Sequence, residues 1–332
     1  MSHYHLYAIG NALVDTEYEV SDEQLARMGV SKRHMTLIDG PRRSELLSHV
    51  QGLHARRTGG GSAANTVVAL AQLGGQGFYS CRVADDELGA YYLQDLQANG
   101  VATNLSHTRA SHGQTGSCMV LVTPDAERSM CTFLGVSAEL ERSALHPQDI
   151  ARSRIYYMEG YLAASPTGLE AALEGRRIAR EHQVRLALTL SDVSMIQFCR
   201  AGLEAMIGDG LDYLFANEEE AQTWCATQDL PSIVSALAPL ARTVCLTRGP
   251  KGCLVLQDGQ VHEVAAVPTQ AIDTNGAGDM FAGTFLYGVT QGWGAERAAA
   301  LANRTASAVV SQHGNRLVRE QMQDLLKTDV QH

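Results

Sequence analysis

The sequence predicts an α/β protein in which helices flank a mostly parallel central sheet. Two observations predict this class: short apolar runs of strand-like composition recur along the chain, and segments with helical periodicity separate them, which is typical of βαβ units. The predicted strands are residues 6–9, 78–83, 155–158, 185–190, 213–216 and 243–247. The predicted helices are residues 63–73, 86–98, 167–181, 218–225, 282–288, 295–312 and 320–326.

The composition restricts the class of protein and of partner. The chain has 332 residues, of which 45% are apolar and 19% charged, as expected for a globular protein with a substantial core. Its net charge of −10 argues against nucleic acid as the main partner. The seven cysteines form no C-x-x-C pair, which favours reduced thiols in a cytoplasmic protein. Neither a signal peptide nor a membrane-spanning segment is expected.

Some segments interrupt the alternation and predict a small second sheet that acts as a lid. The expected lid segments are residues 16–20, 34–38, 106–110, 117–122 and 129–133. Most of them alternate like exposed strands, and Pro124 to Glu127 reads as the turn of a hairpin. Closure of such a lid would exclude water from a site between the two sheets. The alternative is an antiparallel extension of the main sheet.

A glycine-rich loop at residues 272–279 precedes a helical pattern that starts at Met280. A loop of small residues that opens a helix leaves backbone N–H groups free, and these groups bind anions such as phosphate. Gly276 and Gly278 allow close approach of a ligand to the backbone. Asp279 is placed to accept a proton from an attacking hydroxyl, although an acid in the first helical turn is also a common cap.

The chain lacks two common nucleotide-binding motifs, the dinucleotide fingerprint and the P-loop. Residues 59–64 satisfy G-x-G-x-x-A, but the preceding residues 53–58 are polar and do not form the buried strand that the dinucleotide fingerprint requires. Lys251 is followed by Gly252 and Cys253, so the P-loop sequence is absent as well.

Several motifs resemble those of the ribokinase-like (PfkB) carbohydrate and nucleoside kinases, in the expected order along the chain. Residues 273–279, Asp-Thr-Asn-Gly-Ala-Gly-Asp, resemble the C-terminal signature of that family. Residues 59–65 resemble its Gly-Gly-x-x-x-Asn loop, residues 10–15 its first-strand motif, and residues 85–89 its Asp-x-x-Gly turn. The resemblance implies a three-layer ribokinase-like fold, with residues 1–332 forming one kinase domain that includes the lid.

Two further segments resemble the nucleotide-binding part of the same family. Residues 217–220 match its Asn-x-x-Glu motif, and residues 247–252 match its Thr-x-Gly-x-x-Gly loop. Without the family context, the first is an ordinary acidic helix start and the second an ordinary turn between two strands.

The resemblance implies a role for each matching residue. The catalytic set is Asp279 as base, with the amides of Gly276, Ala277 and Gly278 as an anion hole. The acceptor-binding set is Asp15, Gly60, Gly61, Asn65, Phe198 and Arg128. The nucleotide-binding set is Asn217, Glu220, Thr247, Gly249, Gly252, Gly276, Gly278, Asn303 and Gly314. Glu220 is also expected to organise Mg²⁺.

Purely structural roles remain open for several of these residues. Asp15 also fits a turn at a strand end, Phe198 a core position, and Arg128 an exposed hairpin position. Asn65 is a poor helix former in a predicted helix, which favours a ligand role over a structural one.

Residues 188–191, 195–198 and 214–221 resemble the adenosine kinase branch of the family. The resemblance implies ATP as phosphoryl donor, Mg²⁺, and a monovalent cation such as K⁺. It implies a small-molecule acceptor, no nucleic acid or membrane partner, and a monomer or homodimer. Gly160-Tyr161-Leu162 departs from the paired aromatics of that branch, so inosine, guanosine, ribose or fructose stay open as acceptors, as does a binding protein without turnover.

Overall fold

The computed structural model describes residues 4–32, 35–125 and 127–329, and its larger sheet has nine strands. Their order is β14-β13-β12-β11-β10-β9-β1-β5-β6. The seven strands from β12 to β6 pair in parallel, whereas β13 and β14 add on in antiparallel fashion. The strands are β1 Tyr4–Ile9, β5 Gly77–Ser80, β6 Val101–Thr103, β9 Ser153–Glu159, β10 Arg185–Thr189, β11 Leu211–Asn217, β12 Ala241–Thr247, β13 Cys253–Gln257 and β14 Gln260–Val264. The predicted mostly parallel central sheet is therefore confirmed.

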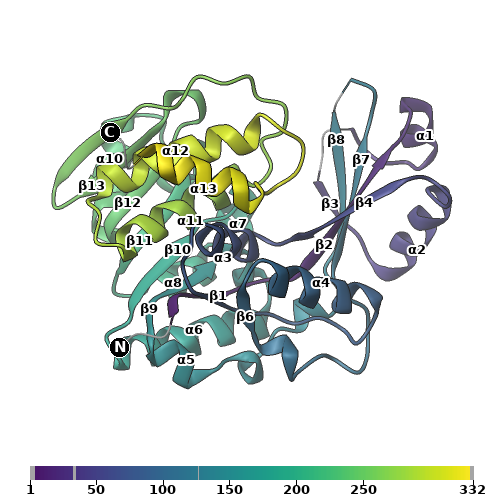
Figure 1. The fold of residues 1–332 in the computed structure, drawn as a ribbon, viewed down its shortest axis with the longest axis horizontal. Helices are drawn as coiled ribbons and strands as arrows, with labels where there is room; N and C mark the ends of the chain where they lie inside the picture. The colour runs from purple at the N-terminus through teal and green to yellow at the C-terminus, as the bar shows by residue number, and fades with distance from the viewer. Residues whose placement is uncertain (1–3, 33–34, 126, 330–332) are drawn as a thin grey trace.

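Helices cover both faces of this sheet and make three layers (Figure 1). Alternate side chains of β1 show the division: Tyr7 and Ile9 join one buried cluster, and Leu6 and Ala8 join the other. The first cluster includes residues of α5 Pro147–Ala151, α6 Pro166–Glu181, α8 Arg200–Ile207, α9 Glu218–Cys225 and α10 Leu230–Leu237. The second includes residues of α3 Ser62–Gln72, α4 Glu87–Ala98, α11 Ala277–Thr290 and α12 Ala295–Val310. The remaining helices of the large body are α7 Val193–Phe198 and α13 Arg319–Asp329.

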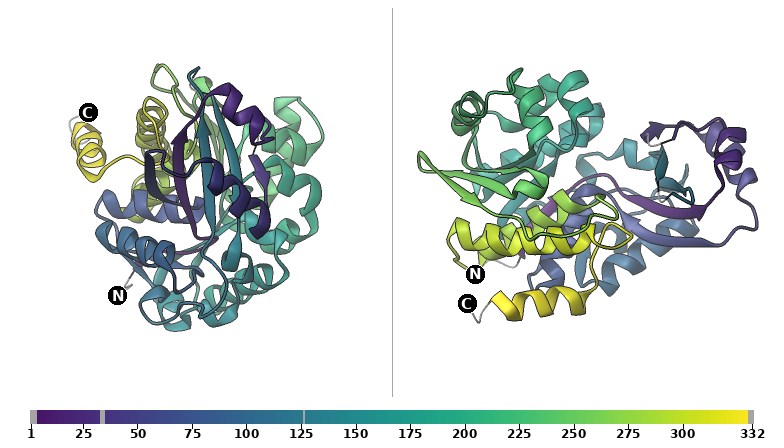
Figure 2. Two further views of the ribbon diagram at one scale, coloured as in Figure 1. Left: turned by 90° about the vertical axis from the view of Figure 1, so that its right-hand side faces the viewer. Right: turned by 90° about the horizontal axis from the view of Figure 1, so that it is seen from above.

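The second sheet is separate and has five strands in the order β3-β8-β7-β2-β4. Its strands are β2 Leu13–Glu19, β3 Met35–Leu37, β4 Ala55–Gly60, β7 Ser117–Val122 and β8 Arg128–Phe133. Short helices α1 Asp22–Arg27 and α2 Gly40–His49 contribute Leu25 and Leu46 to a small apolar cluster with Met119 and Leu121. Figures 1 and 2 show this sheet projecting from one side of the main body. The expected lid is thus a sheet of its own, not an extension of the main one.

Two details of the expected lid are wrong. Residues 106–110 do not belong to the second sheet: they follow a short 3₁₀ turn, Asn104–Ser106, and Ala110 forms an isolated bridge with Ala84. Ala55–Gly60 is a strand although its sequence is polar, because this edge strand leaves residues 55–57 exposed. Positions 34 and 126 of the expected lid and hairpin lie outside the described residues.

The parallel strands place polar residues at one edge of the main sheet. Glu159, Asn217 and Thr247 are the last residues of β9, β11 and β12. The carboxyl ends of parallel strands share one edge, and ligands in open α/β sheets bind outside that edge. Helices α3 and α11 also begin in this region, directly after Gly61 and Gly276.

Candidate active site

Asp279 lies in the first turn of α11 and accepts hydrogen bonds from two residues at the start of α3. Ser62 donates from its hydroxyl to Asp279 Oδ1 at 2.7 Å, and Asn65 donates from Nδ2 to Oδ2 at 2.9 Å. No side chain caps α11, so the alternative of Asp279 as a simple helix cap does not hold. The packing of α3 against α11 therefore holds this carboxylate in a fixed direction.

Burial raises the pKa of Asp279 to about 6, and the hydrogen bonds from Ser62 and Asn65 and the charge of Arg316 oppose that rise. A carboxylate with a pKa somewhat below neutrality is largely ionised at pH 7 yet basic enough to take a proton. Asp279 therefore has the properties of a general base.

The loop before Asp279 exposes the N-terminus of α11. Gly276 has a φ of +78°, and a Cβ there would lie 2.2 Å from the Asn315 carbonyl oxygen, so only glycine fits. Gly278 has no atom within 4 Å of an added Cβ, so its backbone faces open space. Ala277 lies between them at the first helical position. The Ala277 N–H donates to the Thr274 carbonyl at 3.4 Å, whereas the backbone of Gly278 faces open space. Backbone N–H groups at a helix start in an open cavity suit an anion.

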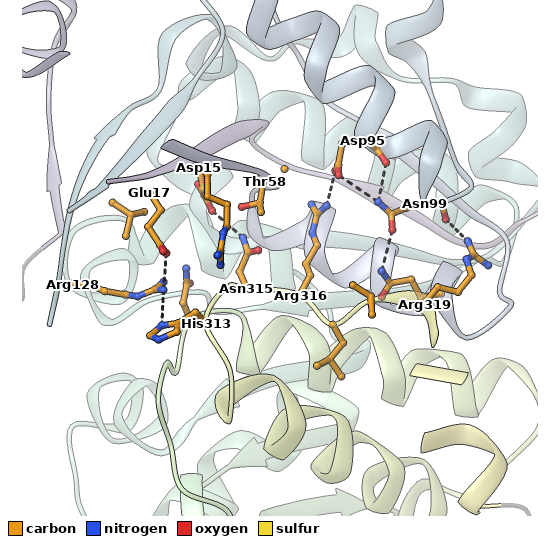
Figure 3. A pocket seen from close by; sticks show the side chains of 18 residues that line it. Asp15, Glu17, Thr58, Asp95, Asn99, Arg128, His313, Asn315, Arg316 and Arg319 are labelled. Carbon is orange, nitrogen blue, oxygen red and sulfur yellow. Dashed lines mark hydrogen bonds and ion pairs between the residues drawn. The ribbon is translucent and has the colours of Figure 1, made fainter. Parts of the chain in front are cut away.

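Asp15 lies in β2 of the lid, where Asn315 donates from Nδ2 to its Oδ2 at 2.9 Å (Figure 3). Burial raises the pKa of Asp15 to about 7, against the opposing charges of Arg316 and Arg128. Gly60 makes room for this carboxylate, because a Cβ on Gly60 would lie 2.6 Å from Asp15 Oδ2. Gly61 has a φ of +99° and likewise tolerates no side chain.

A cavity of about 400 Å³ lies between the lid and the main sheet, and Asp15, Asn65 and Asp279 line it. The lining also includes apolar side chains, most of which come from the lid strands, with one from the residue after β8 and one from α7: Leu13, Met35, Leu37, Met130, Leu134 and Met195. Met35 and Leu37 are 44% and 60% exposed, so the lid presents apolar surface toward open space in the cavity. The cavity is suited to a ligand with a polar end and an apolar end.

Glu159 is fully buried at the end of β9 and lines the same cavity. Its two oxygens accept the backbone N–H groups of Asn11 at 2.6 Å and Ala63 at 2.8 Å. Burial raises its pKa to about 7. Glu159 thus connects the turn after β1 with the first turn of α3. The side chains of Ser62 and Asn65 in that turn donate hydrogen bonds to Asp279 of α11.

A second cavity, of about 750 Å³, lies on the other side of the α11 N-terminus. Thr247, Gly249, Gly252 and Asn303 all line it, as does Asn217. Asn303 uses its amide to hold backbone, since Nδ2 donates to the carbonyls of Val264 and Ala265 at 3.0 Å. Ala277 and Gly278 line both cavities, so two ligands could meet at the helix start.

Glu220 does not line either cavity. It forms a capping box with Asn217: Asn217 Nδ2 donates to Oε1 at 2.7 Å, and the Asn217 N–H donates to Oε2 at 3.1 Å. Burial raises its pKa to about 7, with further contributions from Asp192 and Asp279. The residues of this motif therefore form an ordinary helix cap at the start of α9.

The donor set near Glu220 fits a hydrated cation better than a caged one. Within the described ranges, no three His, Cys, Asp or Glu side chains converge closely enough to hold a metal. Mg²⁺ keeps several waters and takes phosphate oxygens as ligands, so it needs no such cage. The repelling carboxylates Glu220, Asp192 and Asp279 supply the negative field that such a cation would neutralise.

Three residues that were expected to bind a ligand line neither the first nor the second cavity: Phe198, Gly314 and Arg128. Phe198 is 81% exposed and lines neither cavity, because it is the last residue of α7 and lies about one turn beyond Ser194 and Met195, which face the ligand space. Gly314 donates its N–H to Asp273 at 3.0 Å and lines a third cavity beside Asp15, not the one near Thr247.

Arg128 also lies at that third cavity. It pairs with Glu17 at 2.7 Å and with the buried Asp273 at 2.7 Å. It is not an exposed hairpin arginine, because its side chain is only 14% exposed. Arg128 therefore joins the lid to the loop before α11.

Sequence reasoning missed Ser62, Glu159, Asn315 and Arg316. Ser62 lies between two residues that were singled out, and its position at a helix start carried a usable signal. Glu159 is an isolated acidic residue at the end of an apolar run, which is a weaker signal. Asn315 and Arg316 lie in an irregular segment in which no motif pointed to them.

Among the described helices, none is both long and apolar enough to span a membrane. The seven cysteines are all free thiols, in agreement with the sequence expectation of no disulfide framework.

Comparison with known proteins gives consistent results. The model of the pfkB family carbohydrate kinases matches residues 36–322. A curated relative, adenosine kinase of Schizophyllum commune, is 26% identical over 327 residues, which cover 88% of this chain and 90% of the relative. The crystal structure of adenosine kinase from Sinorhizobium meliloti superposes with a TM-score of 0.88 at 34% identity and covers 98% of this chain and 99% of that one.

A probable sugar kinase from Rhizobium etli is equally similar, with a TM-score of 0.88 at 33% identity over 99% of both chains. Family membership makes the chain a phosphotransferase that uses ATP and acts on a nucleoside or sugar hydroxyl. The expected three-layer fold and kinase activity are thereby confirmed, and the chain belongs to the pfkB family of carbohydrate kinases.

Proposed function

We propose that the protein transfers the terminal phosphoryl group of ATP to the 5′-hydroxyl of a ribonucleoside, and that adenosine is the acceptor. The observation that carries this proposal is the cavity between lid and main sheet, whose lining combines polar and apolar side chains. Asp15, Asn65 and Asp279 suit the hydroxyl groups of a ribose, and the apolar side chains of the lid suit a flat base.

In this proposal Asp279 takes the proton of the 5′-hydroxyl as that oxygen attacks the terminal phosphorus. Ser62 and Asn65 hold the carboxylate in line. The amides of Gly276, Ala277 and Gly278 lie where charge develops on the transferred group. Asp15 accepts hydrogen bonds from the vicinal hydroxyls of the acceptor.

ATP is placed in the cavity lined by Thr247, Gly249, Gly252 and Asn303, with its phosphates toward the start of α11. Glu220 would hold Mg²⁺ through water. Mg²⁺ would supply neutralisation of phosphate charge. We include a monovalent cation in the proposal on the basis of the family resemblance alone. The lid would complete the site by excluding water, since β2 carries Asp15 and β3 carries Met35 and Leu37.

The named relatives support adenosine, since proteins described as adenosine kinases occur among both the curated and the structural relatives. The Rhizobium etli relative, described as a probable sugar kinase, supports a free sugar as the second candidate. The apolar lid favours the nucleoside, because a free pentose has no apolar part to cover Met35, Leu37 and Met130.

The deciding experiment measures ATP consumption with adenosine, inosine, guanosine, cytidine, ribose and fructose. We expect the highest kcat/KM with adenosine. A higher kcat/KM with ribose or fructose would replace the nucleoside by a sugar, and no turnover with any acceptor would favour a binding protein. Product analysis by ³¹P NMR identifies the phosphorylated hydroxyl.

A further inference from the structure

A third cavity, of about 280 Å³, adjoins the acceptor cavity but is lined largely by other residues. It lies between lid strands β2 and β4, helix α4 and the segment from residue 313 to 319 (Figure 3). Four residues line both cavities and form the partition between them: Asp15, Val120, Asn275 and Asn315. The proposed phosphoryl transfer assigns no ligand to this space.

The lining is rich in arginine. Arg56, Arg128, Arg316 and Arg319 contribute to it, together with His313. The acidic residues of the lining are already engaged: Asp95 with Arg316 at 2.6 Å, Glu17 with Arg128 at 2.7 Å, and Asp15 with Asn315 at 2.9 Å. Arg56 and Arg319 are exposed and pair with no acidic residue in the described part of the chain, although Arg319 Nη2 donates to the Asn99 carbonyl at 3.0 Å. Charge for an incoming anion is therefore available without breaking the internal pairs.

The cavity also concentrates polar atoms that lack a partner. Three of the five buried side-chain atoms without a hydrogen bond in the described residues belong to its lining: Gln72 Oε1, Arg128 Nε and Arg316 Nη2. The Gln72 residue is 3% exposed and the Arg316 side chain 9%. An unpaired buried polar atom is costly, and such atoms are usually satisfied by a ligand or a water. Two of these atoms are donors on cationic groups and one is an acceptor.

We propose that this cavity binds a small oxyanion, a phosphate or carboxylate compound that also carries a hydroxyl, as an effector of the enzyme. The arginines bind the oxyanion by charge-assisted hydrogen bonds. The hydroxyl donates to Gln72 Oε1. The phosphate and carboxylate forms share this chemistry, and separate probes distinguish them.

Arg316 connects the effector cavity with the catalytic carboxylate. Its Nε donates to Asn65 Oδ1 at 2.7 Å, and Asn65 Nδ2 donates to Asp279 Oδ2 at 2.9 Å. Arg316 and Arg128 are also the cations that oppose the rise in pKa of Asp15, while Asp279 reinforces that rise. The Cys118 thiol, on the neighbouring strand β7, also interacts with Asp15.

The direction of the effect follows from these charges. An oxyanion bound to the arginines offsets their field at Asp15 and thereby favours the protonated form of that carboxyl. A protonated Asp15 accepts fewer hydrogen bonds from the acceptor. The oxyanion therefore raises the KM for the acceptor and leaves the KM for ATP unchanged.

The test compares wild type with the double variant R56A/R319A and with the matched control R57A. Arg57 follows Arg56 in β4 but pairs with Glu87 at 2.6 Å and does not line the cavity. The probes are inorganic phosphate, glycerol 3-phosphate and malate at constant ionic strength and free Mg²⁺. Thermal shift and calorimetry are run with adenosine and a non-hydrolysable ATP analogue in saturating amounts, so that the active site is filled.

We expect at least one probe to bind saturably to wild type and R57A, and about 10-fold or more weakly to R56A/R319A. Preference for glycerol 3-phosphate or inorganic phosphate over malate identifies phosphate as the ligand group, and the reverse identifies carboxylate. Absence of binding by all three probes, or equal binding by R56A/R319A, would overturn the proposal.

The kinetic arm rests on the proposed phosphoryl transfer, whereas the binding arm does not. R56A/R319A should keep the basal turnover and lose the rise in acceptor KM caused by the probe. Binding without any acceptor turnover would refute the proposed function and leave the oxyanion site standing.

Discussion

Asn65 donates a hydrogen bond through its amide nitrogen to Asp279 Oδ2 at 2.9 Å. The orientation of this amide is fixed from its other side, because Arg316 Nε donates to Asn65 Oδ1 at 2.7 Å. Asp95 in turn holds Arg316 at 2.6 Å. A chain of charged and polar groups thus runs from α4 to the first turn of α11, and the direction of each bond is determined by its neighbour.

The pH dependence of turnover should depend on the donors to Asp279. The pKa of Asp279 is raised to about 6, so kcat of the wild type at saturating acceptor should fall below about pH 6 as the base becomes protonated. Ser62→Ala removes a donor to the ionised form and should move this acidic limb upward by about one pH unit. Initial rates from pH 5 to 9 measure it.

Ser307→Ala, at the edge of the ATP cavity, is the control and should keep the wild-type profile. If the acidic limb of Ser62→Ala stayed at the same pH as that of the wild type, a group other than Asp279 would be responsible for it.

Asp279→Asn should lower kcat on the order of 10²–10⁴-fold, which is the usual contribution of a general base. The side chain keeps its size, and Nδ2 cannot accept a proton. Affinity for ATP and the melting temperature should change little. Steady-state kinetics, calorimetric titration with ATP and thermal unfolding measure the three quantities. Turnover close to the wild type would rule out Asp279 as the base.

Asp15→Ala should act on the acceptor alone. The carboxylate lines the acceptor cavity and not the one assigned to ATP, so its loss should raise the acceptor KM about 10- to 100-fold, the equivalent of hydrogen bonds to one charged group. The KM for ATP should stay constant. If instead only the KM for ATP rose, the two cavities would have been assigned in the wrong order.

Glu159 should make stability depend on pH. Its pKa is raised from 4.5 in the unfolded reference to about 7 in the fully buried site. Between these values the folded state binds more protons than the unfolded state, so the free energy of unfolding falls as pH rises, by up to about 1.4 kcal/mol per pH unit for one group. The contribution is largest below the lower pKa and is lost as pH rises through about 7.

Glu159→Gln removes this titration, so the free energy of unfolding of the variant should gain on that of the wild type from pH 5 to pH 8. Urea unfolding at intervals of one pH unit measures the difference. The variant starts from a lower value, because the Gln amide nitrogen cannot accept one of the two backbone N–H groups. The exposed Glu23→Gln is the control, and a difference independent of pH in Glu159→Gln would contradict the raised pKa.

Most of the main sheet could be predicted because its buried parallel strands are continuous apolar runs. The edge strand Ala55–Gly60 could not, since its residues 55–57 are all exposed and leave no alternation of apolar and polar residues to read. The lid assignment of residues 106–110 failed for the opposite reason: an irregular segment between two correctly predicted elements was given a role it does not have.

The site shows the same limit. Asp15, Asn65 and Asp279 lie in motifs that resemble those of the family and could be found from the sequence. The pairing of these residues with their partners could not be predicted, because Ser62 contacts Asp279 across 217 residues and Arg316 contacts Asn65 across 251 residues. Pairing over such distances is set by how α3, α11 and the C-terminal segment pack.

The two glycines of the loop before α11 should respond differently to the same substitution. Gly276→Ala places a methyl group 2.2 Å from the Asn315 carbonyl oxygen at a φ of +78°, and should destabilise the protein by at least about 2 kcal/mol. Gly278→Ala meets no atom within 4 Å and should leave the stability unchanged or slightly higher. Its methyl group would instead occupy space at the junction of the acceptor and ATP cavities.

Gly278→Ala should therefore fold normally and lose on the order of 10² in kcat, comparable to the removal of one anion-hole donor. Thermal unfolding and steady-state kinetics on the two variants separate the effects, each variant serving as the control for the other. A stable Gly278→Ala protein with full turnover would show that the phosphoryl group does not approach the start of α11. In that case the amides of Gly276, Ala277 and Gly278 would have no part in the transfer.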